Sequence, residues 1–145
     1  MSNSKGFGLG FAVVSFAVIV FAAPPVAAFA SSTAHASNAQ GNLSVLAQPQ
    51  QVSLATDGLY APTMESLTSD DFGQAARPGV GAVLSYVVNA SRTHYVSAAK
   101  LDDQVMVSSD EHLGEVTCGS YNAECLAQVT SDSDLVAAPA QWINF

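Results

Sequence analysis

The sequence predicts a small, mainly β fold: an antiparallel β-barrel or sheet with a disulfide-linked hairpin, placed after an N-terminal signal peptide. Three observations lead to this prediction. Residues 6–34 carry no charged side chain and begin with a long apolar run. From residue 80 onward, short stretches rich in β-branched and aromatic residues alternate with polar turns. Two cysteines, Cys118 and Cys125, flank one of these turns. The 145 residues leave room for one modest domain.

Residues 1–30 have the organisation of a secretory signal peptide. A short polar start containing Lys5 precedes the apolar run FGLGFAVVSFAVIVFAA, which is followed by two prolines and a tail of small residues. A weakly positive start, an apolar stretch and a small-residue cleavage site occur in this order in export signals. Two sites have the A-x-A form, one ending at Ala30 and the other at Ala36. We predict cleavage after Ala30, with Ala36 as the alternative site.

An uncleaved membrane anchor is the alternative interpretation of the same segment. The apolar stretch 6–23 is close to the lower limit of about 17 residues that a membrane-spanning helix requires. The two prolines and the lack of flanking charge on the far side favour cleavage instead. A membrane contact is therefore expected only if this N-terminal helix is retained.

The charge of the predicted mature chain excludes one class of partner. Removal of residues 1–30 leaves three basic side chains, Arg77, Arg92 and Lys100, against twelve acidic ones, and thus a net charge of −9. Such a surface repels the phosphate backbone, so we expect no nucleic-acid binding. Cationic partners and loosely held divalent cations remain compatible with it.

The first part of the mature chain has no clear period. Residues 31–58 are rich in Ser, Ala, Gln and Asn, and we expect a flexible lead-in with one short strand near 52–55. The β-rich domain then extends over 59–145. It begins with a short helix within 64–72, for which Thr63 or Ser69 provides a cap.

Strands and turns follow in the second half of the chain. We predict a strand over 80–88, a turn of helix or an extended entry over 96–100, a strand over 104–107, polar turns at 108–112 and 131–134, and a last extended segment over 135–145.

The two cysteines predict a crosslinked hairpin. Cys118 shares a strand face with Val116, and Cys125 shares one with Val129, while residues 119–122 have turn composition. An even number of cysteines in an exported chain favours a disulfide. A bridge that closes so short a loop contributes about 2–3 kcal/mol. The C-x6-C spacing lacks the close cysteine pair of a zinc site.

We find no convincing catalytic, cofactor-binding or metal-binding residues. Ser97 and Lys100 match S-x-x-K, but the S-D-N and K-T-G elements that accompany it in penicillin-recognising enzymes are absent. A small exported serine hydrolase using this pair, or a serine with His94, is the enzymatic alternative, and it requires Ser97 and Lys100 side by side in a concave pocket. The other histidines, His35 and His112, are scattered.

Acidic and glycosylation motifs also have ordinary explanations. The acidic groups at 102–103, 110–115 and 132–134 lack the alternating oxygen ligands around a glycine that calcium loops use. Solvated turns explain them better. Asn42 and Asn89 begin N-x-[ST] motifs, which matter only in a host that glycosylates exported proteins.

The C-terminal part of the chain resembles the PRC-barrel family of small β-barrels. The residues that carry this resemblance are Ser97, Lys100-Leu101, Val105-Met106-Val107, the turn Ser109-Asp110-Glu111, Leu113-Gly114-Glu115-Val116, and a closing segment of Val136-Ala137-Ala138-Pro139 with Trp142-Ile143. The resemblance implies a non-catalytic module without a cofactor that docks onto proteins or a larger assembly.

The leading functional hypothesis is therefore an exported, non-enzymatic β-domain that acts through contacts with a protein partner, in the periplasm, outside the cell or at the cell envelope. It requires that Val105, Val116, Val129 and Val136 share a core. The second hypothesis is a membrane-anchored subunit of an envelope complex that keeps residues 1–30.

Overall fold

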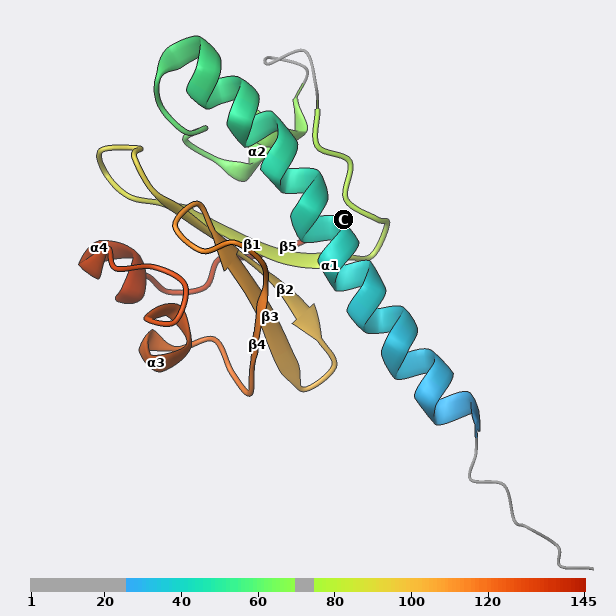
Figure 1. The fold of residues 1–145 in the computed structure, drawn as a ribbon. Helices are drawn as coiled ribbons and strands as arrows, with labels where there is room; N and C mark the ends of the chain where they lie inside the picture. The colour runs from blue at the N-terminus through green and yellow to red at the C-terminus, as the bar shows by residue number, and fades with distance from the viewer. Residues whose placement is uncertain (1–25, 70–74) are drawn as a thin grey trace, which may run out of the picture.

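The computed structural model describes residues 26–69 and 75–145. Its elements are, in chain order, α1 (Val26–Asp57), α2 (Met64–Thr68), β1 (Val83–Val88), β2 (Tyr95–Leu101), β3 (Gln104–Ser109), β4 (Val116–Cys118), α3 (Ala123–Leu126), α4 (Ser133–Val136) and β5 (Trp142–Asn144). The long helix α1 lies along one side of the sheet, and the short helices α3 and α4 lie on the other (Figure 1).

The five strands form one antiparallel sheet in the order β4-β3-β2-β1-β5. Strands β1, β2 and β3 form a meander, and β5 returns to pair with β1, with Leu84 opposite Ile143. The antiparallel sheet is confirmed, but the sheet is open rather than closed into a barrel. Closure fails because the edge strands β4 and β5 have three residues each and lie at opposite edges.

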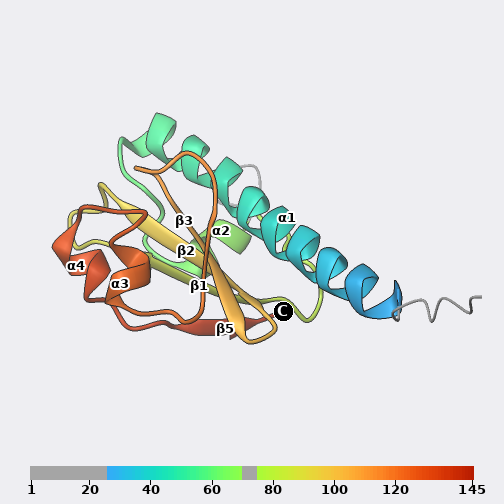
Figure 2. The same cartoon turned by 60° about the horizontal axis from the view of Figure 1, so that its bottom comes forward.

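Central strand β2 explains why residues 96–100 were ambiguous from sequence. Its first five residues are all buried, because helices cover both faces of the sheet (Figure 2). A strand that is buried on both sides does not alternate between apolar and polar residues. The sequence YVSAAKL therefore lacks the period that identifies a half-exposed strand.

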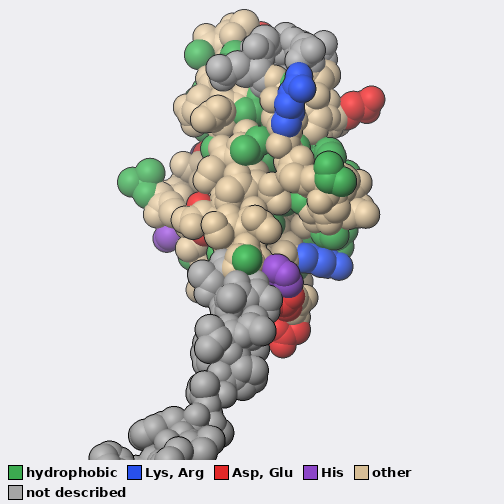
Figure 3. Space-filling view, turned by 90° about the vertical axis from the view of Figure 1, so that its right-hand side faces the viewer, with side chains coloured by type: hydrophobic (Ala, Val, Ile, Leu, Met, Phe, Trp, Pro, Cys, Tyr) green, Lys and Arg blue, Asp and Glu red, His purple; other side chains and the backbone are tan. Residues whose placement is uncertain are grey.

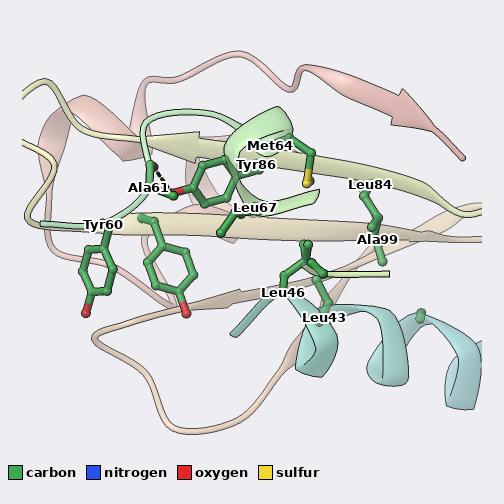
Figure 4. Packing of buried hydrophobic residues seen from close by; sticks show 12 residues of the cluster. Leu43, Leu46, Tyr60, Ala61, Met64, Leu67, Leu84, Tyr86 and Ala99 are labelled. Atoms are coloured by element: carbon green, nitrogen blue, oxygen red, sulfur yellow. Dashed lines mark hydrogen bonds between the residues drawn. The ribbon is translucent and has the colours of Figure 1, made fainter. Parts of the chain in front are cut away.

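The core between α1 and the sheet contains leucines of α1 and aromatic residues of the strands. Leu43 and Leu46 point from α1 toward Leu84 and Ala99 (Figure 4). The hydroxyl of Tyr86 donates to the carbonyl of Ala61 at 2.6 Å, so this buried phenol is satisfied. Tyr60 and Tyr95 pack edge to face with ring centroids 4.9 Å apart, and Leu67 of α2 completes the cluster.

The predicted short helix near residue 64 is confirmed as α2. Thr63 is its N-cap, with Oγ1 accepting from the backbone N–H of Ser66 at 3.2 Å. The helix ends at Thr68, earlier than the predicted limit of residue 72, and Ser69 is its C-cap.

The opposite face of the sheet carries a second, aliphatic core. Its buried residues are Val96, Ala98, Val105, Val107, Cys125, Leu126, Val129 and Leu135. Val116 and Val136 pack against the same cluster. The expectation that Val105, Val116, Val129 and Val136 share a core is therefore confirmed.

The prediction of a flexible lead-in over 31–58 with a strand near 52–55 is wrong, because α1 covers these residues. The buried positions of α1 include 39, 43, 46, 50 and 53, spaced by three and four residues as one helix face requires. Two of them are polar, Gln50 and Ser53, and one is only alanine. The buried positions of α1 therefore follow the helical period, but the apolar residues in its sequence do not, because some of the buried residues are polar.

Both polar residues of this helix face have partners that only the fold supplies. Oε1 of Gln50 accepts from the backbone N–H of Ala61 at 3.1 Å, and the hydroxyl of Ser53 donates to the carbonyl of Leu59 at 2.8 Å. These bonds connect α1 to the segment that leads into α2. Pro49 lies inside α1, at a position where helices rarely accept proline.

The disulfide is formed, but the predicted hairpin around it is wrong. Cys118 and Cys125 are joined with a Cα–Cα distance of 5.9 Å. Cys118 ends β4, whereas Cys125 lies in α3. Asn122 causes the difference, since its Oδ1 accepts from the N–H of Cys125 at 2.9 Å and caps a helix instead of forming a hairpin turn.

The tail differs from its prediction in the same way. The polar segment at 131–134 was expected as a turn, but Asp132 caps α4, with Oδ1 accepting from the N–H groups of Asp134 and Leu135. Residue 136 therefore ends a helix rather than beginning a strand. The last extended segment is confirmed only over β5.

The greater part of the predicted signal peptide lies outside the described residues. Of residues 1–30, the structure describes the backbone of 26–30, which begins α1. Within the described ranges, the search for a helix with the length and apolar character of a membrane span finds none.

Candidate functional site

Ser97 and Lys100 do not form the pair that a serine hydrolase would require. They lie on β2 three residues apart and so point to opposite faces of the sheet. Ser97 is 1% exposed, and its hydroxyl lies 3.0 Å from that of Ser108. Lys100 is exposed on the other face, with Nζ 5.0 Å from the centroid of the Trp142 ring.

The three histidines lie in three separate places. Nδ1 of His35 lies 2.9 Å from Oδ1 of Asp102 at an exposed position, which brings α1 next to the β2–β3 turn. His112 is exposed in the loop before β4. Only His94 takes part in an extended polar network.

This network, which we name the His94 cluster, consists of Asn89, His94, Asp110, Glu111 and Asp132. It joins the turn between β1 and β2 to the end of β3 and the start of α4. Nδ1 of His94 lies 2.8 Å from Oδ2 of Asp110 and 3.2 Å from Oε1 of Glu111. The amide of Asn89 donates to Oδ2 of Asp132 at 2.8 Å.

The charges of the His94 cluster support one another. The hydrogen bond that the His94 ring donates to the carboxylate of Asp110 is the main cause that raises the pKa of His94, so the imidazolium is favoured. The backbone N–H of Ser131, which donates to Glu111 at 2.6 Å, lowers the pKa of that carboxyl. The side chain of Asn89 does the same for the pKa of Asp132.

The His94 cluster connects segments that are far apart in the chain. Each carboxylate is already engaged by a backbone or side-chain donor. Over residues 26–69 and 75–145, no group of three or more His, Cys, Asp or Glu side chains is arranged to hold a metal ion. Asn89 is buried within this network, so its glycosylation motif is part of the folded structure.

A second candidate site is a groove at the other end of strands β2 and β3. We name it the Trp142 groove; it has a volume of about 560 Å³. Three segments line it: the β2–β3 turn with Asp102 and Asp103, the disulfide loop with Tyr121, and residues 136–140. The rings of Tyr121 and Trp142 meet edge to face with centroids 5.8 Å apart.

The Trp142 groove could not be predicted from the sequence, because its residues are far apart in the chain. Trp142 was named only as part of the PRC-barrel resemblance, and in the structure it packs against the aliphatic core. The turn residues 102–103 were interpreted as a solvated acidic pair. The composition offered one signal: the chain has a single tryptophan, and it lies near the C-terminus.

A smaller hollow of about 440 Å³ lies between α1 and the segment that leads into β1. Asn42 of α1 accepts from the N–H of Gly79 at 2.9 Å beside it, which ties the two elements together. Asn42, the start of the other glycosylation motif, is therefore also used in the fold.

Comparison with protein-family models, curated proteins and solved structures finds no match for this chain. The resemblance to PRC barrels stays a prediction. The candidate sites are the His94 cluster, which holds segments together, and the Trp142 groove, which is open to a ligand.

Proposed function

We propose that this chain is an exported, non-enzymatic subunit that acts through contacts with a protein partner at the cell envelope or in the periplasm. The observation that carries the proposal is the outer face of α1. The helix is 32 residues long, about 48 Å at 1.5 Å per residue, and its only charged residue is Asp57 at the C-terminal end.

The exposed positions along the middle of α1 form a continuous uncharged stripe. They include Gln40, Ser44, Gln48, Gln51 and Ala55, which follow one another at intervals of three or four residues. Solvent-facing helix surfaces carry charged or polar side chains, and this stripe has polar ones without a charge. Figure 3 shows that charged groups are also sparse on the neighbouring face of the molecule. The side chain of Gln40 donates to the carboxylate of Glu115 at 3.2 Å, so a charged group lies beside one end of the stripe. Burying the stripe from Ser44 to Ala55 against a partner requires no desolvation of a charge of its own.

The arrangement of α1 is compatible with export and processing. Among the side chains of α1 that the structure describes, from residue 34 onward, the first buried one is Ala39, after both proposed cleavage sites at Ala30 and Ala36. Cleavage at either site therefore leaves all of these buried residues in the chain. The disulfide suits an oxidising compartment, and the PRC-barrel resemblance agrees with a docking module.

The intact mass of the protein from its native host, with and without reduction, tests export. We expect the mass of a chain that lacks residues 1–30 or 1–36. On reduction, this mass should increase by that of the hydrogens added to the sulfurs of Cys118 and Cys125. A full-length chain with free thiols would contradict the proposal of export.

The contact through α1 has its own test. Ser44→Glu with Gln48→Glu places two charges on the uncharged stripe and is expected to abolish the native complex in size-exclusion chromatography. The matched control, Ser133→Glu with Gln128→Glu, adds the same charges on α4 and next to α3, where both residues are exposed. Loss of the complex in both variants, or in neither, would reject α1 as the contact surface.

The continuity of α1 favours a second candidate, a membrane-anchored subunit of an envelope complex. The helix runs through both Ala30 and Ala36 and begins directly after the apolar run and its two prolines. Figures 1 and 2 show its N-terminal part extending past the sheet. Recovery of the full-length, oxidised chain in the membrane fraction would establish this version, and a shortened chain in the soluble fraction would exclude it.

A further inference from the structure

We propose that the Trp142 groove binds a basic side chain, arginine or lysine, presented by a protein partner. This inference rests on the proposed function, since it names the chemistry of the partner that a non-enzymatic exported subunit contacts. Three features of the groove support it: an aromatic ring that accepts a cation, two carboxylates that form no ion pair with a described lysine or arginine, and space for an incoming side chain.

The Trp142 ring is oriented to accept a cation. Lys100 holds its ammonium 5.0 Å from the ring centroid, which is within the range of a cation–π interaction. The edge-to-face contact with Tyr121 fixes the plane of the ring. Lys100 is flexible and exposed, so an arginine or lysine from outside can take its place over the ring.

Two carboxylates, those of Asp102 and Asp103, line the same groove as the ring. Asp102 and Asp103 form the two-residue turn between β2 and β3, because Leu101 pairs with Gln104. Within the described part of the chain, the ion pairs all involve histidine, and no Lys or Arg is paired with a carboxylate. Among the described residues, the ion-pair partner of Asp102 is His35, and the Asp102 side chain is 57% exposed; Asp103 forms no ion pair with the described residues.

The groove and the whole molecule match a basic partner in size and charge. A volume of about 560 Å³ falls within the usual range for ligand sites and exceeds what one side chain needs. The amide group of Gln104 also lines it, and its carbonyl oxygen can accept a hydrogen bond from a guanidinium or ammonium group. The net charge of −8 attracts a basic partner over a longer distance and increases its rate of association.

The single tryptophan makes the test direct. We would titrate the disulfide-bonded protein with a short Gly- and Arg-containing peptide and follow both Trp142 fluorescence and the anisotropy of a label on the peptide. The matched ligand is the same peptide with citrulline in place of arginine. Binding and a fluorescence change with arginine but not with citrulline are expected. Equal binding of both peptides, or no response of Trp142, would overturn the proposal.

Two pairs of variants separate the groove from general attraction to an acidic surface. Asp102→Asn with Asp103→Asn is expected to weaken peptide binding about fivefold. Asp102 has φ 53°, a conformation that Asn also adopts, so the turn is retained. The control, Asp57→Asn with Glu65→Gln, removes equal charge at the far end of α1 and on α2. An equal loss in both doubles would overturn the proposal.

A substitution of Lys100 is expected to strengthen peptide binding instead of weakening it. Lys100→Met leaves the Trp142 face free and is expected to tighten peptide binding about two- to fivefold. Arg77→Met removes the same charge at another exposed position and is expected to change binding less. No gain from Lys100→Met beyond that of Arg77→Met would contradict a site over the ring. These measurements use purified protein, so their failure would leave the mass and localisation tests of export unaffected.

Discussion

The two faces of the sheet are stabilised in different ways. On the α1 face, one long helix whose only charged residue is Asp57 packs leucines against tyrosines, and Gln50 and Ser53 hold the following segment through hydrogen bonds. On the other face, two helices of four residues each cover an aliphatic core. Such short helices are not stable by themselves. Caps at Asn122 and Asp132, and the Cys118–Cys125 disulfide, stabilise them instead.

This contrast shows how a small domain secures two cores with one sheet. The α1 face depends on the area that a continuous helix buries, so its stability comes from packing. The face covered by α3 and α4 depends on the helix caps and the disulfide, which restrict the conformations of a segment with little regular secondary structure. Substitutions in the two regions should therefore differ both in size and in their response to reduction.

The largest effect is expected from a cavity on the α1 face. Leu46 is fully buried between α1 and the sheet, and Leu46→Ala should reduce the free energy of unfolding by about 2–5 kcal/mol. The change in the free energy of unfolding is measured by urea unfolding, with circular dichroism as the signal. Gln48→Ala on the exposed side of the same helix is the control, with an effect of about 0.5 kcal/mol or less. If both substitutions lowered the free energy of unfolding by similar amounts, the packing of Leu46 between α1 and the sheet would not be a main source of stability.

Removal of the disulfide tests the other face. Cys118→Ala with Cys125→Ala should lower the free energy of unfolding by about 2–3 kcal/mol, because the bridge restricts the unfolded chain. We also expect limited proteolysis to begin within residues 119–140, while α1 stays resistant. Cleavage that began in α1 would contradict the separation of the two regions.

The cap of α3 is expected to contribute less. Asn122→Ala leaves the N–H of Cys125 without its acceptor and should cost about 1 kcal/mol, measured by urea unfolding. Asn122→Asp keeps an acceptor oxygen and is the matched control. A loss of equal size in both variants would show that the carboxamide acts through another contact.

The smallest effect is a pH dependence at the His94 cluster, where the two regions meet the β1–β2 turn. The pKa of His94 is raised, so its contribution is fully present below the ordinary histidine pKa and is lost as pH rises through the raised value. The pKa values of Glu111 and Asp132 are lowered, so their contributions are present above the ordinary carboxyl pKa and are lost as pH falls through the lowered values. Stability should therefore be greatest between these two ranges.

The measurement compares wild type with His94→Gln by urea unfolding at about pH 5.5 and about pH 8. The wild-type protein should be more stable at the lower pH, and the variant should lose most of that difference. An unchanged difference in the variant would assign the pH dependence to other groups.

Much of the β-sheet could be predicted from sequence, because it depends on local patterns. The apolar runs of β1 and β3 are bounded by polar turns, and Thr63 precedes a helical stretch, so each was recognised. The partner of Cys118 followed from there being only two cysteines. The Trp142 groove was missed, since its sides come from three separate segments.

The sequence by itself determined the acidic charge, the cysteine pair, and the stretches that form strands β1, β3 and β5. Only the tertiary structure decided that α1 is a helix with a buried face, because Gln50 and Ser53 are acceptable in the core only when Ala61 and Leu59 supply their hydrogen bonds. It also decided that the chain after Cys118 becomes α3, where the Asn122 cap and burial of Leu126 outweigh the hairpin pattern. Local patterns depend on neighbours in the chain, whereas these outcomes depend on partners that folding brings together.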